Sequence, residues 1–262
     1  MAVDDLMRLD RDGSVGILRF LRPEKRNPYS IAFAKMLVEH LAEAERDDSI
    51  RALVITGGDH FSSGGDLIGF QTVIADGARA TSEMVEKVHN GGQAVYQFKK
   101  PLIAAVNGVA FGAGFSLALS ADIIVAAETA RFCQVFAKVG GCPDTGSSWL
   151  LQQRCGAGIA RMLVFTGREI DGRTAKALRV VEECVPAAEF ETCALAIARE
   201  IAAHPAFGMQ SSKRVMLSVT DKSYLEALDI ERDVQSILLC AHDFPEAMKA
   251  FLEKRTPQFK DR

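Results

Sequence analysis

The sequence has no excess of positive charge. Lysine and arginine together number 31, against 34 for aspartate and glutamate, which gives a formal net charge of −3. A chain with this balance has no general attraction for a polyanion, and no basic helix supports an RNA-binding role. Nucleic acid is therefore not expected as a partner.

Cysteine pairs and long apolar runs are missing as well. The six cysteines form no CxxC pair and no cluster with histidine, so we expect reduced thiols and no metal site. No apolar run reaches membrane-spanning length, and the first residues, MAVDDLMRLDRDG, carry acids where a targeting peptide would be basic. These absences predict a soluble, cytoplasmic protein without a membrane partner.

Common nucleotide-binding and hydrolase motifs are also absent. The chain has neither a G-x-G-x-x-G fingerprint nor the Gly-Lys-Ser/Thr of a P-loop. It lacks the G-x-S-x-G turn that presents a nucleophilic serine, which argues against a serine hydrolase.

The apolar runs predict an α/β fold. Runs typical of strands occur at Val15–Leu21, Ala52–Thr56, Leu102–Val106 and Ile123–Ala126. Between them, Ile31–Arg46 places apolar residues at helical spacing, and Ala113–Ser120 is predicted as a helix of small residues. Strands that alternate with helices in this way favour a layered α/β architecture.

The last part of the chain is predicted to be helical. From Glu189 onward no strand pattern returns, and we expect this helical module to pack on the α/β core or on a neighbouring subunit. The least well specified segment is Ile74–Val95, where Gly77, Gly91 and Gly92 are expected to interrupt a charged helix.

Two glycine-rich turns follow two of the predicted strands. HFSSGGDL (residues 60–67) follows the strand Ala52–Thr56, and NGVAFGAGF (residues 107–115) follows Leu102–Val106 and begins a helix. A turn of this kind directs backbone N–H groups and the positive end of a helix to one point. Tight packing of a helix on the sheet is the simpler explanation for one such turn. Two turns together favour an oxyanion hole, which needs two donors from different segments.

Five segments carry a pattern that extends over nearly the whole chain. They are RPEKRNPYS, FSSGGDL, AAVNGVAFGAGFSLALSADIIVA, VFTGREIDGRTAKALRVVEECVP and AFLEKRTPQF. Together they resemble the enoyl-CoA hydratase/isomerase (crotonase) superfamily. The resemblance implies a spiral of ββα turns with a CoA-thioester site in residues 1–193 and a helical trimerisation region in residues 194–262. It also implies an acyl-CoA substrate, a homotrimer or dimer of trimers, and no separate cofactor, because coenzyme A is part of the substrate.

The resemblance assigns roles to particular residues. The backbone N–H groups of Gly65 and Ala113, in the two glycine-rich turns, would hold the thioester oxygen. The residues implied to contact the CoA phosphates or adenine are Lys25, Arg26, Phe251 and Lys254, the last two often across a subunit boundary. For the lysines and the arginine, a solvated surface charge is the alternative explanation.

The two glutamates that handle water in hydratases of this family are missing here. Their positions match Ser116 and Phe136. A serine hydroxyl is too weak a base without an activating partner, and phenylalanine has no proton to exchange. Hydration by the usual two-carboxylate route is therefore not expected.

Asp144, in GGCPDTGSSW, has two interpretations. An acid just before an apolar run is typical of a helix cap. The resemblance instead places Asp144 where the ring-1,2-epoxyphenylacetyl-CoA isomerase branch keeps a single catalytic aspartate. One carboxylate is enough to move a proton between two carbons, and burial beside an acyl chain would raise its pKa toward the working range. We expect the catalytic role, with capping as an additional one.

His89 offers a second mechanism. His89 and Asp144 also match the histidine and aspartate of the 4-chlorobenzoyl-CoA dehalogenase branch, in which aspartate attacks the ring and histidine activates water. The tryptophan of that branch is Phe136 here. Two further alternatives stay open, a hydratase that uses another route and a non-catalytic acyl-CoA-binding protein. Among the remaining residues, Trp149 is predicted to pack in the core and Asp66 to shape its loop.

Overall fold

The computed structural model describes residues 6–261. Residues 1–5, the start of the segment considered above as a targeting peptide, lie outside the described residues. No helix within residues 6–261 is both long and apolar enough to cross a membrane.

Six strands form the main sheet. In order across the sheet they are β1 (Met7–Asp12), β2 (Val15–Phe20), β3 (Ala52–Thr56), β4 (Leu102–Val106), β6 (Ile123–Ala127) and β9 (Glu183–Val185). β1 and β2 form an antiparallel hairpin, and the other neighbours are parallel. Every residue of β3 and β4 is buried, as expected for parallel strands that are covered on both faces.

A smaller sheet consists of β5 (Val109–Phe111), β7 (Arg131–Cys133) and β8 (Ile170–Asp171). β4 is followed by β5 and then by helix α4 (Ala113–Leu119). Likewise, β6 is followed by β7, the short helix η2 (Val135–Val139) and α5 (Ser147–Thr166). This repeated order of strand, strand and helix confirms the predicted α/β fold with a spiral of ββα turns.

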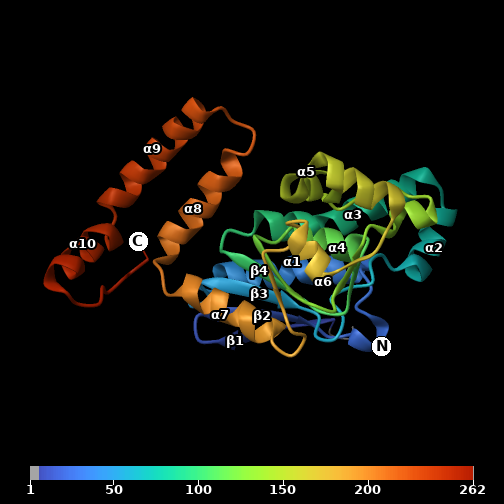
Figure 1. Ribbon diagram of the computed structural model, residues 1–262, viewed down its shortest axis with the longest axis horizontal. Coiled ribbons are helices and arrows are strands. Elements are labelled where there is room, and N and C mark those ends of the chain that lie inside the picture. The colour runs from blue at the N-terminus through green and yellow to red at the C-terminus, as the bar shows by residue number, and fades with distance from the viewer. Residues whose placement is uncertain (1–5, 262) are drawn as a thin grey trace.

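Helices lie on both sides of the main sheet (Figure 1). α1 (Ile31–Arg46) packs against α3 (Ala78–Gln97) on one side, while α7 (Phe190–Ala202) packs against β2, β3 and β4 on the other. The predicted start of α1 is confirmed, because the side chain of Ser30 accepts a hydrogen bond from the Phe33 N–H at 3.1 Å. The remaining short helices are η1 (Pro23–Lys25) and α6 (Gly172–Ala177).

The expected interruption of the helix between Ile74 and Val95 is only partly correct. Gly77 does separate α2 (Leu67–Ala75) from α3, but Gly91 and Gly92 lie inside α3. A Cβ atom at Gly91 would stand 2.2 Å from the Tyr29 hydroxyl, and one at Gly92 would stand 2.4 Å from Cγ2 of Thr145. These two glycines therefore allow close packing against α3 and do not break it.

The last three helices project from the sheet as an arm (Figure 1). The arm consists of α8 (Ala206–Ser218), α9 (Tyr224–Cys240) and α10 (Asp243–Glu253). Its exposed large apolar side chains include Met216, Tyr224, Leu225, Ile237, Met248, Phe251 and Leu252. The predicted boundary at residue 194 falls within α7, which packs on the sheet, and the division into two regions stays a prediction.

A charge pair attaches α8 to the main sheet. Nζ of Lys213 donates to Oδ2 of Asp122 at 2.6 Å and to the carbonyl oxygen of Lys100 at 3.1 Å. The same carboxylate oxygen accepts the N–H of Leu102, the first residue of β4, at 2.8 Å. The Lys213 side chain is 8% exposed and that of Asp122 is 28% exposed, so most of the pair is shielded from water.

We predict that Lys213→Met lowers the free energy of unfolding. It leaves the Asp122 carboxylate without its cation, and we expect a loss of about 2 kcal/mol, below the roughly 3–5 kcal/mol of a fully buried pair. Urea denaturation at a fixed protein concentration measures the change.

Arg214→Met is the matched control, because Arg214 follows Lys213 on the same helix and is exposed. We expect its effect to stay within about 0.5 kcal/mol. Adding Asp122→Asn to Lys213→Met should recover part of the loss, because no unpaired charge remains. Equal losses for Lys213→Met and Arg214→Met would contradict the anchoring role of the pair.

Candidate active site

The two glycine-rich turns lie directly against each other. The Ser62 N–H donates to the Val109 carbonyl oxygen at 2.9 Å, and the Phe111 N–H donates to the Ser62 carbonyl oxygen at 3.0 Å. A Cβ atom at Gly64 would stand 2.6 Å from the Phe111 carbonyl oxygen, and one at Gly114 would stand 2.6 Å from Cβ of Ser62. Only glycine permits this backbone approach at both positions.

The contact brings the amides of Gly65 and Ala113 into neighbouring turns. Tyr29 pairs with Gly65 through a parallel bridge that uses the Gly64 carbonyl oxygen and the Asp66 N–H. The N–H of Gly65 takes no part in that bridge. Ala113 is the first residue of α4, where an N–H has no partner inside the helix. The Gly64 Cβ position lies 3.5 Å from the Ala113 nitrogen, so the predicted pair of donors is on adjoining backbone.

Asp144 lies in the turn that precedes α5, but its side chain does not cap the helix. The N-cap is Gly146, without a side-chain cap hydrogen bond, so the capping interpretation of Asp144 is wrong. Thr145 and Gly146 both have positive φ values, 50° and 83°, and this turn separates Asp144 from the first turn of the helix. The buried Ser147 holds the turn through its N–H and its hydroxyl, each of which donates to the Asp144 carbonyl oxygen at 3.0 Å.

The surroundings of Asp144 raise its pKa on balance. Burial raises the pKa of the carboxyl. The Thr145 hydroxyl, which donates to Oδ1 at 3.1 Å, and the nearby His89 oppose this rise. Burial also raises the pKa of Tyr29, and the negative charge of Asp144 adds to that effect. Asp144 therefore interacts with His89 on α3 and with Tyr29, the bridge partner of Gly65.

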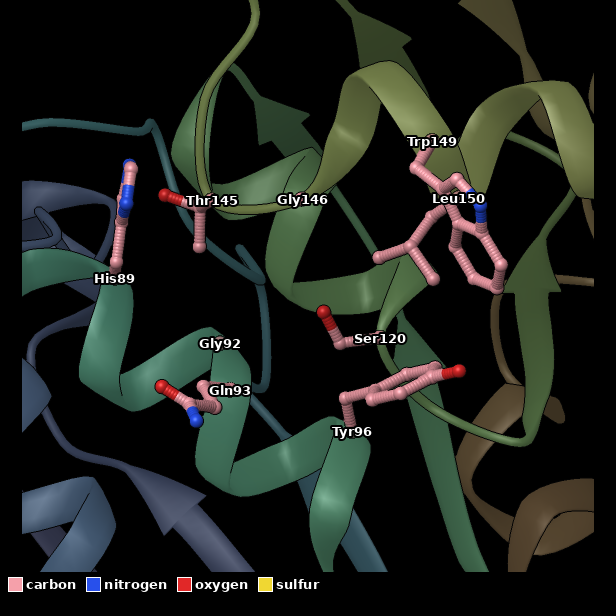
Figure 2. Close-up of a pocket in the computed structure, with 9 residues that line it drawn as sticks. All are labelled: His89, Gly92, Gln93, Tyr96, Ser120, Thr145, Gly146, Trp149 and Leu150. Carbon is pink, nitrogen blue, oxygen red and sulfur yellow. The ribbon is translucent and has the colours of Figure 1, made fainter. Parts of the chain in front are cut away.

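A cavity of about 450 Å³ lies between α3 and the start of α5, where Thr145 and Gly146 line it directly after Asp144 in the sequence, although Asp144 itself is not a lining residue. Its lining residues are His89, Gly92, Gln93, Tyr96, Ser120, Thr145, Gly146, Trp149 and Leu150 (Figure 2). In Figure 2, His89 and Thr145 lie at one end, and Tyr96 and Trp149 lie at the other. Nε2 of His89 is buried and has no hydrogen-bond partner among residues 6–261.

Trp149 corrects one expectation. It was predicted to pack in the core, yet it is 44% exposed and lines this cavity. Its ring meets the ring of Tyr96 edge to face, with 5.9 Å between the ring centroids. An apolar residue near the start of a helix has the same sequence pattern whether it packs in the core or lines a cavity. The sequence alone therefore did not distinguish these two positions.

A second cavity, of about 770 Å³, lies beside the first glycine-rich turn and contains one of the predicted CoA contacts. Lys25 lines it, together with Asp66 and Ile68. Arg26 does not line it, although its carbonyl oxygen accepts the Ser63 N–H at 2.7 Å and so ties η1 to the turn. The structural role predicted for Asp66 is confirmed, because its carboxylate caps α2 through the Gly69 N–H at 3.0 Å.

The other predicted CoA contacts lie outside the site within one chain. Phe251, which is 83% exposed, lies on α10, and Lys254 ends that helix. Figure 1 places α10 on the far part of the arm, away from α3 and α5. Contact across a subunit boundary stays a prediction for both residues.

The positions of the missing glutamates hold no ionisable group. Ser116 is buried in α4 and its hydroxyl donates to the Gly112 carbonyl oxygen at 3.1 Å. Phe136 lies in η2, and its ring would be 3.7 Å from a Cβ atom at Gly112. Sequence reasoning missed Tyr29, Gln93, Tyr96 and Ser120 as parts of the site, because their roles depend on spatial neighbours and not on a local motif.

Comparisons with known proteins identify the family of this chain. Residues 10–262 match the family model for enoyl-CoA hydratase/isomerase. The chain is 36% identical to the 1,2-epoxyphenylacetyl-CoA isomerase of Escherichia coli strain K12, over 91% of this chain and 92% of that protein. It is 34% identical to the 2,3-dehydroadipyl-CoA hydratase of the same organism, over 97% and 98% of the two chains.

A solved structure agrees over the same length. The crystal structure of an enoyl-CoA hydratase from Polaromonas sp. JS666 superposes with a TM-score of 0.92 at 32% identity and covers 97% of this chain and 99% of that chain. Relatives with isomerase names and with hydratase names are both similar to this chain. The protein is therefore an enzyme of the enoyl-CoA hydratase/isomerase family, the crotonase superfamily, whose members act on acyl-CoA substrates.

Proposed function

We propose that the enzyme isomerises an unsaturated or ring-derived acyl-CoA, with Asp144 as its single proton shuttle. The observation that carries this proposal is that, of the three positions that could supply a carboxylate to the reaction, only position 144 holds one. Asp144 is partly buried beside the cavity and has a raised pKa, while the two glutamate positions of hydratases hold Ser116 and Phe136. The similarity to a 1,2-epoxyphenylacetyl-CoA isomerase supports the same assignment.

The proposed reaction moves one proton and leaves the atomic composition unchanged. The thioester oxygen accepts hydrogen bonds from the N–H groups of Gly65 and Ala113. The Asp144 carboxylate removes a proton from a carbon of the acyl group, and the electron pair of that C–H bond passes into the enolate. The protonated Asp144 then returns the proton at another carbon. No second base is needed, which fits the absence of carboxylates at positions 116 and 136.

A dehalogenase-like hydrolysis is the second candidate. The observation that favours it is His89, which lines the same cavity, acts electrostatically on Asp144 and has a buried Nε2 without a partner among the described residues. In that reaction the Asp144 carboxylate displaces halide from the aromatic ring and forms an aryl ester. His89 then takes a proton from the water that hydrolyses this ester, which releases the hydroxylated ring and regenerates Asp144. Phe136 argues against it, because it supplies no indole N–H to the carboxylate.

The CoA moiety is proposed to bind beside the first glycine-rich turn, with its phosphates near Lys25 and Arg26. Phe251 and Lys254 are too far along the arm to serve their own site, so we propose that they reach the site of a neighbouring subunit. The exposed apolar side chains of the arm support association of subunits, because large exposed apolar surface is typical of interfaces. The assembly that we propose is a homotrimer or a dimer of trimers.

We predict that Asp144→Asn abolishes isomerisation of a 3-enoyl-CoA to the conjugated 2-enoyl-CoA. The amide keeps the shape of the side chain but cannot accept the proton, so kcat/KM should fall by about 10²- to 10⁴-fold. Absorbance of the conjugated thioester and mass spectrometry follow the product. Asp171→Asn is the matched control, because Asp171 caps α6 through the Thr174 N–H and lines neither cavity of the site, and asparagine caps a helix as well as aspartate does, so activity should be retained.

The same assay distinguishes the other activities. Hydration of 2-enoyl-CoA that is unaffected by Asp144→Asn would contradict the proposed role of Asp144. Chloride release from 4-chlorobenzoyl-CoA that is lost in both Asp144→Asn and His89→Gln would establish the hydrolase. No product from any of these esters, with binding still visible in the fluorescence of Trp149, the only tryptophan, would favour an acyl-CoA-binding protein.

We predict that the acid side of the pH profile reports Asp144. Only the carboxylate accepts a proton, and burial raises its pKa, so kcat/KM should fall with decreasing pH at a higher pH than for an ordinary carboxyl. Thr145→Val removes the hydroxyl that lowers this pKa and should move the acid limb to higher pH. Thr145→Ser keeps the hydroxyl and should leave it in place. A limb that moves to lower pH in Thr145→Val would refute the assignment.

We predict that the arm mediates assembly. Light scattering should give the unmodified protein a mass that is three or six times the 28.4 kDa of one chain. Leu225→Glu combined with Leu252→Glu places charges on exposed apolar positions of α9 and α10 and should give monomers. Lys35→Glu, on the exposed face of α1, is the control and should keep the assembly. A monomeric unmodified protein would exclude the proposal.

A further inference from the structure

The end of the cavity beside Asp144 that lies away from His89 is lined by an aromatic pair. Tyr96 comes from the end of α3 and Trp149 from the start of α5. Their rings meet edge to face at 5.9 Å with an interplanar angle of 88°. Figure 2 shows this pair opposite His89, with Gln93 and Ser120 between the two ends. An acyl group that extends from Asp144 along α3 therefore meets these two rings.

Another cavity lies behind Tyr96. It measures about 560 Å³ and lies between the end of α3 and the arm helix α8. Its apolar lining includes Phe98, Phe207 and Leu217. Among residues 6–261, Tyr96 is the one that lines both cavities, so its side chain borders each of them.

We propose that Tyr96, packed against Trp149, limits the length of the acyl group and makes the enzyme selective for acyl groups that end inside the first cavity. Short chains and single rings belong to that class, whereas a long chain must displace the Tyr96 ring to enter the space beside α8. The proposal rests on the proposed function only in assigning the first cavity to the acyl group. The second cavity offers the extra apolar volume that a longer chain would fill once the ring is gone.

Binding of saturated acyl-CoA esters tests this limit on chain length without catalysis. Butanoyl-, hexanoyl-, octanoyl- and decanoyl-CoA are titrated by calorimetry against the full-length protein, below the concentrations at which these esters form micelles. Each additional buried methylene group should strengthen binding about fourfold. In the unmodified protein we expect this gain to stop within the series, where the chain reaches Tyr96.

Tyr96→Ala should restore the gain of about fourfold per methylene through decanoyl-CoA. Tyr96→Phe keeps the ring and should retain the limit of the unmodified protein. Gln97→Ala is the matched control and should keep the limit, because Gln97 lines the cavity behind Tyr96 but not the cavity beside Asp144. If Tyr96→Ala is poorly folded, Tyr96→Leu replaces it, since leucine is shorter but keeps an apolar contact with Trp149, and it should extend the limit by fewer methylene groups.

Two results would overturn the inference. One is an uninterrupted gain in affinity through decanoyl-CoA in the unmodified protein. The other is a limit that stays unchanged in both Tyr96→Ala and Tyr96→Leu. Because saturated esters cannot be isomerised, failure of the isomerase assay leaves the chain-length result standing, and a missing chain-length limit leaves the isomerase proposal standing.

Discussion

The close backbone contact between the two glycine-rich turns is the constraint on which the rest of the site depends. At Gly64 and Gly114 the neighbouring backbone or side chain stands where a Cβ atom would be. This contact sets Gly65 beside the first residue of α4, and it therefore fixes both the point at which a thioester oxygen can bind and the start of the helix. The position of α4 in turn places Ser120 in the cavity beside Asp144. A methyl group at either glycine would move all of these elements together.

Asp144 is subject to opposing effects that are consistent with a proton shuttle. Burial favours the neutral carboxyl, whereas the Thr145 hydroxyl and His89 favour the carboxylate. A carboxyl group that must both accept and return a proton needs its charged and its neutral form to differ little in free energy. Here burial and the polar neighbours of Asp144 act in opposite directions on that difference. The backbone contributes as well, because the left-handed residues Thr145 and Gly146 keep the side chain out of the cap of α5. A carboxylate in the cap would be held by helix N–H groups, which would stabilise its charged form.

The sequence predicted those parts of the molecule whose patterns are local and repeated. Strands such as β3 and β4 are five-residue apolar runs, and α1 has a capping serine and an apolar face. β5, β7 and β8 were not predicted, because two or three residues are too short to show a period. The pattern predicts interruptions at the glycines of α3, and the prediction is wrong for Gly91 and Gly92, because a sequence does not show what lies against a missing side chain.

In the candidate site, too, the sequence predicted only the residues that lie in local motifs. Gly65, Ala113 and Asp144 lie in recognisable motifs. The structure places Gly65 and Ala113 in neighbouring turns, and it places Asp144 close enough to Tyr29, the bridge partner of Gly65, for their charges to interact.

The charge pair of Lys213 and Asp122, which attaches the arm, was found only in the structure. It lies at the first residue of β4, whereas the second glycine-rich turn follows the last residue of that strand. A buried five-residue strand is a stiff spacer of about 16 Å between the two. Changes to the surface of the arm are thereby kept apart from the proposed oxyanion hole of the chain that carries them, and their effect on the reaction passes through the neighbouring subunit that the arm is proposed to contact.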